Sequence, residues 1–391
     1  MKRLLYIPLL LMLLVALAAF GPEPDPEATA SPDGASVTEN GIRVLDNSYA
    51  VNFPYNIVFS LEAEVDANIT NVTFFYRLGD RRVTVYGYPS FGPGNHITAT
   101  FHLETGSRGS FPVGTDIEYT FLLEDGSGRQ YETEPRTAEY LDPSFDWQRV
   151  ELDNLMVVYH DRSDEQVARV AENVNARLDA VHDMFGLQDT KPMKAVLVNT
   201  SDEASRSFPT VSQTADNVNL YAGFAFGEYD VFVMIGINED TMVHEMAHLI
   251  LDEAMTSPIA RVPSWLNEGL AMYFEDHSSG YNRDLANAIR DDRLIPIRHM
   301  AVQPGQPDAV ILFYAQANSF VRYLIDSHGI ERMQALLGEI AFGRRMDDAL
   351  DRAYGTTLED LERGWRTSIG APLPEPTPAS VDEAPSVGGT S

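Results

Sequence analysis

The spacing of apolar residues changes part-way along the chain, and this change most constrains the fold. Between residues 37 and 145, apolar and polar residues alternate in short runs, as at 56–65, 71–77 and 96–102. Turn signals rich in Gly, Asp and Pro separate these runs. Alternation of this kind, broken by turns, predicts antiparallel strands, and several such strands in succession predict a β-sandwich. We therefore expect residues 37–145 to form an all-β sandwich.

After residue 146 the pattern becomes mixed and then mostly helical. Strands are predicted at 155–159, 194–198, 218–226 and 230–235. Apolar residues at helical spacing predict an amphipathic helix over 164–185, and an almost wholly apolar run predicts a buried helix over 239–254. Further helices are predicted at 264–276, 282–291, 311–327, 330–340, 346–353 and 357–368. A half that contains strands, followed by a helical half, predicts an α+β domain over 146–370.

Charge and cysteine content exclude several classes of partner and site. The 391-residue chain has 28 basic and 58 acidic residues, a net charge of −30. Such a surface repels nucleic acid and anionic lipid, so we expect no nucleic-acid partner. The chain has no cysteine, which excludes disulfides and cysteine-based metal sites. A transition metal would therefore have to be held by His, Asp and Glu.

The N-terminus resembles a targeting segment. Lys2 and Arg3 precede an apolar run that extends to residue 20. Two interpretations of residues 1–20 remain open: a cleaved signal peptide, with a small-x-small site at 16–18, or a retained membrane anchor. Both predict a secreted or extracytoplasmic protein, and the second predicts a membrane tether.

The organisation along the chain is therefore multidomain. Segments rich in Pro, Ala and acidic residues predict a disordered linker at 21–36 and a disordered tail at 371–391. Two folded parts remain, 37–145 and 146–370. For the first, an immunoglobulin-like or fibronectin-like sandwich is the natural architecture.

The motif with the clearest chemistry is His244-Glu245-Met246-Ala247-His248. Residues four apart lie on one face of a helix, so both imidazoles can reach one ion. Glu245 lies about 100° round the helix, where it can face a water bound to that ion. A pair of core histidines is the alternative, but burying two imidazoles in an apolar helix is costly unless they are satisfied.

Glu268 supplies the third predicted ligand. It belongs to the segment Ser264-Trp-Leu-Asn-Glu-Gly-Leu-Ala, which is predicted to begin a helix. Glu268 lies in the second turn of that helix, among apolar neighbours. A carboxylate in such surroundings needs a cation or a hydrogen-bond donor. Two His and one Glu form a known catalytic zinc set that leaves the fourth position for water. We expect one zinc ion per chain, held by His244, His248 and Glu268.

Together these residues resemble a known family. The pattern H-E-x-x-H, nineteen residues, then Glu in W-L-N-E-G-L-A-x-Y is similar to the gluzincins, and most similar to the peptidase MA-like group. The resemblance covers residues 147–370 and implies a zincin-like domain. It also implies a zinc metallopeptidase, or protease, in which Glu245 is the general base and the substrate is a peptide or protein.

The same resemblance implies two further features. Tyr314 matches a tyrosine that stabilises the oxyanion in related aminopeptidases; packing between helices is the alternative, and Tyr273, His299 and His328 are weaker candidates. The strand at 230–235 is expected at the sheet edge, where related zincins pair with the substrate backbone, or else in the core.

One position departs from the family pattern. Thermolysin-like enzymes carry an Asp four residues after the Glu ligand, where it supports a histidine, and this chain has Met272 there. Asn267 or Asp252 is expected to orient an imidazole instead, with an ordinary surface or cap role as the alternative for each.

A second function stays open beside the peptidase. A homologue that binds zinc without activity could act at the cell surface as a binding or scaffold protein through its β-sandwich. The intact Glu245 favours the enzyme, because no structural role requires a carboxylate there.

Overall fold

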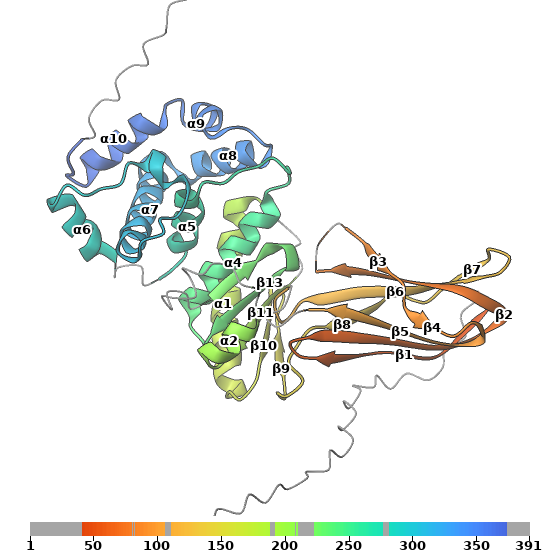
Figure 1. Cartoon of the computed structure of the whole chain (residues 1–391). Helices are drawn as coiled ribbons and strands as arrows, with labels where there is room; N and C mark the ends of the chain where they lie inside the picture. The colour runs from red at the N-terminus through yellow and green to blue at the C-terminus, as the bar shows by residue number, and fades with distance from the viewer. Residues whose placement is uncertain are drawn as a thin grey trace, which may run out of the picture.

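The computed structural model describes residues 41–79, 81, 83–105, 111–187, 192–207, 209, 223–276 and 281–373. The chain runs from an elongated set of strands, through a mixed α/β layer, into a group of helices (Figure 1). The predicted targeting segment, the linker at 21–36 and almost all of the tail lie outside the described residues. Within the described residues, no helix combines the length and apolar character needed to cross a membrane.

The first eight strands form one antiparallel sheet, which we call the β-region. Its central order is β4-β5-β2-β6-β7, with β1 and β3 also paired to β2, and β8 paired to β6. The strands are β1 Ile42–Asn52, β2 Asn56–Leu78, β3 Val85–Gly87, β4 Ser90–Phe91, β5 Gly94–Glu104, β6 Asp116–Asp125, β7 Gln130–Glu132 and β8 Arg136–Glu139.

The long strand β2 makes this sheet double-layered. Its first half pairs with β1 and β5, and its second half pairs with β6 and β3. The rings of Phe59 and Phe74 lie 4.8 Å apart, although fifteen residues of extended strand would span about 50 Å. The strand therefore folds over between them, where its register shifts between Glu64 and Ile69. The two halves face each other across a shared core, as in a sandwich.

The second sheet has the order β12-β13-β11-β10-β9. Its strands are β9 Gln148–Glu151, β10 Leu155–Tyr159, β11 Met193–Val198, β12 Gly223–Phe226 and β13 Val231–Ile235. The helices α1 (Asp164–Phe185) and α4 (Glu239–Ala254) pack on one face and bury Val174, Ile250 and Phe232 with it. The opposite face, with Val196 and Val233, belongs to the same hydrophobic core as the β-region.

A buried lysine reinforces the contact between the two sheets. Lys194 in β11 is 6% exposed. Its Nζ donates to the Gly114 carbonyl at 2.9 Å, to Asp116 at 2.7 Å and to Glu139 at 2.8 Å. All three acceptors belong to the β-region or to its loops, so the ammonium is satisfied only when the two parts are together.

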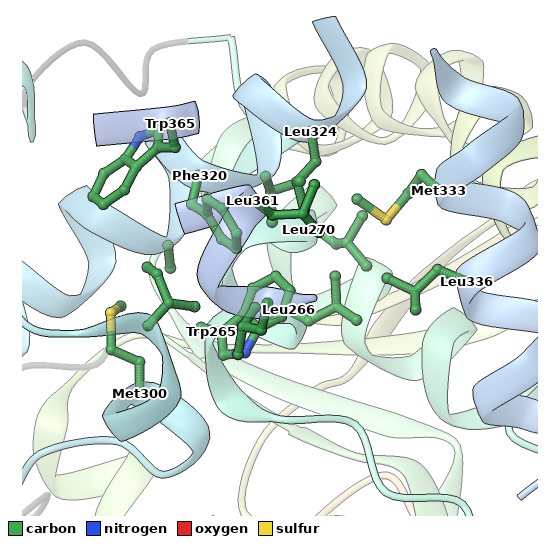
Figure 2. Close-up of a cluster of buried hydrophobic side chains, with 14 of the residues drawn as sticks. Trp265, Leu266, Leu270, Met300, Phe320, Leu324, Met333, Leu336, Leu361 and Trp365 are labelled. Carbon is green, nitrogen blue, oxygen red and sulfur yellow. The ribbon is translucent and has the colours of Figure 1, made fainter. Parts of the chain in front are cut away.

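The helical half forms a separate core, drawn in Figure 2. There Trp265, Phe320 and Trp365 pack together, with Trp265 and Trp365 on either side of Phe320. The helices of this half are α5 Ser264–Tyr273, α6 Asn282–Arg290, α7 Pro307–His328, α8 Ile330–Ala341, α9 Met346–Tyr354 and α10 Leu358–Ser368. The short helix α2, Ser201–Ser207, instead packs on the second sheet, against β13. Gly269 lets α5 approach α7 closely, because a Cβ there would lie 2.6 Å from the Ala317 carbonyl oxygen.

The predicted fold class is confirmed: an antiparallel β-region precedes a mixed α/β part with a helical C-terminal half. Helices α1 and α4 begin and end at the predicted residues. Their first turns are capped by Ser163 and Asn238, whose side chains accept backbone N–H groups. The exact domain boundaries stay predictions, as does the finer likeness to immunoglobulin or fibronectin domains.

Candidate metal centre

The two histidines lie on one face of α4, as their spacing predicts. The imidazole rings of His244 and His248 are 4.8 Å apart and nearly perpendicular, at 86°. Asn238 caps the helix, and the negative charges of Glu239 and Asp240 in the first turn interact favourably with the positive end of the helix dipole. The remaining apolar side chains of α4 bury this helix against the sheet, so the imidazoles are held by a rigid element.

Glu268 on α5 completes the group. Its Oε2 lies 3.4 Å from Nε2 of His244 and 3.4 Å from Nε2 of His248. Ligands about 2.1 Å from a tetrahedral zinc ion are about 3.4 Å from one another, so these separations suit such an ion. Among the described residues, buried Oε2 has no hydrogen-bond partner. A buried carboxylate oxygen that has no hydrogen-bond partner and faces two Nε2 atoms would be satisfied by a bound cation, and so the residues fit zinc.

The other nitrogen of each imidazole is held by a neighbouring acceptor. Nδ1 of His244 lies 2.7 Å from Glu275 Oε1, and Nδ1 of His248 lies 2.7 Å from Asn267 Oδ1. An acceptor at Nδ1 keeps the proton there and leaves the Nε2 lone pair for a metal. The prediction for Asn267 is confirmed. The alternative for Asp252 is wrong, because Asn267 occupies that position.

Glu275 was not among the predicted residues. It lies just beyond the end of α5, seven residues after Glu268, and so about two helical turns further along the same face. That spacing is the signal that could have found it. Its carboxylate holds Nδ1 of His244 from a position beyond the helix.

The electrostatics of the group favour a positive charge at its centre. Burial lowers the pKa of His244, but the carboxylates of Glu268 and Glu275 outweigh burial and raise it to about 10. Burial likewise lowers the pKa of His248, and Glu268 reverses that effect. Burial raises the pKa of Glu268, yet the imidazoles of His248 and His244 hold it far below its usual range. A divalent cation between these groups would be stabilised by the same carboxylates.

Glu245 is buried beside this group, on the side facing β12. It is 9% exposed, and its carboxylate accepts a hydrogen bond from the Ala225 backbone N–H. Gly223 leaves room for it, since a Cβ there would lie 3.3 Å from Glu245 Cγ. Burial raises the pKa of Glu245. A buried carboxylate with a raised pKa accepts a proton more readily than an exposed one.

Strand β13 does not lie at the sheet edge, which was one of the two positions expected for residues 230–235. It lies between β11 and β12 and pairs with both. In the described part of the chain, the strand at that end of the sheet is β12. The hypothesis of an edge at 230–235 is therefore wrong, because β12 and β13 form a hairpin in which the earlier strand lies outside.

Two tyrosines approach each other on the helical side. Tyr314 in α7 accepts a hydrogen bond from Gln303 Nε2 at 2.8 Å. Its ring lies 6.4 Å from that of Tyr281, at the start of α6. Burial raises the pKa of Tyr281, and the negative charges of Glu275 and Glu268 raise it further.

The weaker candidates have other surroundings. Tyr273 carries the Arg322 guanidinium over its ring at 5.1 Å. His299 lies on the exposed side of the short helix Ile297–Ala301, and His328 packs against Tyr323 and Tyr354. None of these contacts involves the three ligands.

Two imidazoles and a carboxylate, with a buried glutamate beside them, define a zincin-type site. The model of the Peptidase MA superfamily matches residues 173–371, half of the chain. The chain belongs to this superfamily, and the cluster of His244, His248 and Glu268 supports a zinc metallopeptidase. No curated protein matches the chain.

Three solved structures show limited likeness. An M1 zinc metallopeptidase from Deinococcus radiodurans is 12% identical, over 82% of this chain and 92% of its own, with a TM-score of 0.37. An aminopeptidase N family protein from Idiomarina loihiensis is 9% identical, over 83% of this chain and 73% of its own, with a TM-score of 0.36. The BhCBM56 structure is 16% identical, over 27% of this chain and 99% of its own, with a TM-score of 0.20. Because these scores are below 0.5, the assignment rests on the family model.

Proposed function

We propose that this protein hydrolyses peptide bonds with a zinc ion held by His244, His248 and Glu268, and with Glu245 as general base. The observation that carries the proposal is the buried Oε2 of Glu268, which has no hydrogen-bond partner among the described residues and lies 3.4 Å from two Nε2 atoms. Zinc bound there would lower the pKa of a water molecule and polarise the peptide carbonyl.

The chain's own residues supply the rest of the reaction. Glu245 takes the proton of the attacking water, and the Ala225 N–H holds its carboxylate in place. The edge strand β12 offers a backbone along which an extended peptide can lie, next to Glu245. The net charge of −30 favours neutral or basic peptides over acidic ones.

The test is cleavage of a library of internally quenched peptides by residues 21–391. We expect cleavage that a chelator abolishes and that added zinc restores. Peptides with free and blocked N-termini would separate exopeptidase from endopeptidase action. Zinc-loaded protein that cleaves no peptide would contradict the proposal and favour the binding or scaffold function.

We propose that a tyrosine of the pair Tyr314 and Tyr281 donates to the oxyanion, and that it is Tyr314. Loss of one such donor costs about 10²- to 10³-fold in kcat. Tyr314→Phe is therefore expected to lower kcat by about 100-fold with zinc retained, and Tyr281→Phe by much less. Steady-state kinetics on both variants decide between them. A larger loss in Tyr281→Phe would assign the role to that residue instead.

We further propose that the protein works outside the cytoplasm, on the basis of the basic and then apolar N-terminus. Mass spectrometry of the mature N-terminus would distinguish a cleaved signal peptide from a retained membrane tether. A mature protein found only in the cytoplasm would contradict both.

A further inference from the structure

The turn after β12 connects the candidate active site with the β-region. Gly227–Tyr229 forms a single helical turn directly after β12, and Asp230, at φ 58°, leads the chain back into β13. This turn fixes the end of the β12–β13 hairpin. Whatever holds the turn therefore affects the position of β12.

Residues of the β-region surround Tyr229 in this turn. The Arg81 guanidinium lies 5.3 Å from the centre of the Tyr229 ring, and the Phe111 ring lies 6.3 Å from it. Arg81 Nη2 also pairs with Glu228 Oε2 at 2.5 Å. Gly79 abuts the backbone here, because a Cβ at Gly79 would lie 2.5 Å from Tyr229 Cα. Gly79 is itself anchored in the β-region by its N–H, which donates to the Asp116 carbonyl at 2.8 Å.

The other end of the same hairpin reaches Glu245. Ala225 donates its N–H to the Glu245 carboxylate, and Gly223 packs on its Cγ. Only four positions separate Ala225 from Tyr229. A continuous path of contacts therefore runs from Gly79 and Arg81, through Tyr229 and β12, to Glu245.

We propose that Gly79 and Arg81 of the β-region position β12 against Glu245, so that the β-region forms part of the frame of the active site. Arg81 and Tyr229 are positioning residues in this proposal, since neither touches the ligands. The proposal rests on the proposed function of Glu245 and extends it to a role for the β-region.

The test compares two arginines of the β-region in the full chain loaded with zinc. Arg81 and Arg77 have similar side-chain exposure, 44% and 45%, and each pairs with one glutamate. The partner of Arg77 is Glu118, within the β-region, whereas the partner of Arg81 is Glu228 in the turn. Arg77→Ala is therefore a matched control for Arg81→Ala, and Arg81→Lys is the conservative variant.

Amide hydrogen exchange of residues 223–229 is the first measurement. We expect Arg81→Ala to raise these exchange rates by about 3- to 10-fold. This factor corresponds to losing the stabilisation that an exposed ion pair and a cation–π contact together give against local opening. Tyr229→Ala should raise them further, whereas Arg77→Ala should not change them. Arg81→Lys should retain most of the protection.

The second measurement is kcat/KM for peptide cleavage, together with bound zinc. We expect kcat/KM to fall by about 3- to 10-fold in Arg81→Ala, in step with the loss of protection, at unchanged zinc content. Equal exchange in Arg81→Ala and Arg77→Ala would overturn the proposal. Faster exchange with an unchanged kcat/KM would also overturn it, because the contact would then not position Glu245. Exchange requires no turnover, so a failure of the proposed function would be seen separately.

Discussion

Replacing Glu245 by glutamine is expected to leave zinc bound and to lower kcat by about 1,000-fold. A general base contributes about 10²- to 10⁴-fold, and an amide cannot take the proton of the attacking water. The amide oxygen can still accept the Ala225 N–H, so the position of the side chain and the fold should be preserved. The measurement is kcat for a peptide found in the library, with zinc content determined on the same sample.

Glu253→Gln is the matched control, since Glu253 lies on the exposed side of the same helix. It should retain full activity. If Glu245→Gln cleaved the peptide at the wild-type rate, Glu245 could not be the base. If the variant lost its zinc, Glu245 would be needed to hold the metal, which contradicts its assignment as a base outside the ligand set.

Removal of the β-region is expected to prevent the remainder of the chain from folding. Five valines of the second sheet, Val158, Val196, Val198, Val231 and Val233, share a core with the β-region. Burial of a valine is worth about 1.5 kcal/mol or more, so exposing all five costs about 7 kcal/mol or more. That loss is comparable with the whole stability of a typical domain, about 5–15 kcal/mol.

Residues 146–391 and residues 37–391 should therefore be compared for soluble yield and thermal unfolding. We expect the longer chain to unfold cooperatively and the shorter one to aggregate or to show no transition. A soluble fragment 146–391 with an unchanged melting temperature would show that this part does not need the shared core for its stability. The β-region would then be an independently folding domain.

The elements that could be predicted are those whose signals are local. Ser163 and Asn238 mark the starts of α1 and α4, and the apolar spacing behind them gives the length of each helix. The fold of β2 on itself could not be predicted, because neither Gly nor Pro interrupts its alternation between 56 and 78. The position of β12 outside β13 could not be predicted either, because the sequences of two short apolar strands do not reveal which one lies at the sheet edge.

The same division applies to the site. His244, His248 and Glu268 follow from spacing along two helices, and the structure brings the three together. Glu275 and Tyr281 lie at or beyond the ends of α5 and α6, where the direction of the chain depends on tertiary packing. The contact of Glu275 with His244 arises only when α5 packs beside α4, and that of Tyr281 with Tyr314 only when α6 packs beside α7.

One zinc ion held by His244, His248 and Glu268 is the basis of the proposed activity. The most direct measurement is the zinc content of the purified full chain by mass spectrometry, compared with Glu268→Ala and with His299→Ala, an exposed histidine on the helical side. The structure predicts about one zinc per chain in the wild type and in His299→Ala, and almost none in Glu268→Ala. Wild-type protein without zinc, or Glu268→Ala protein that retains it, would contradict the claim.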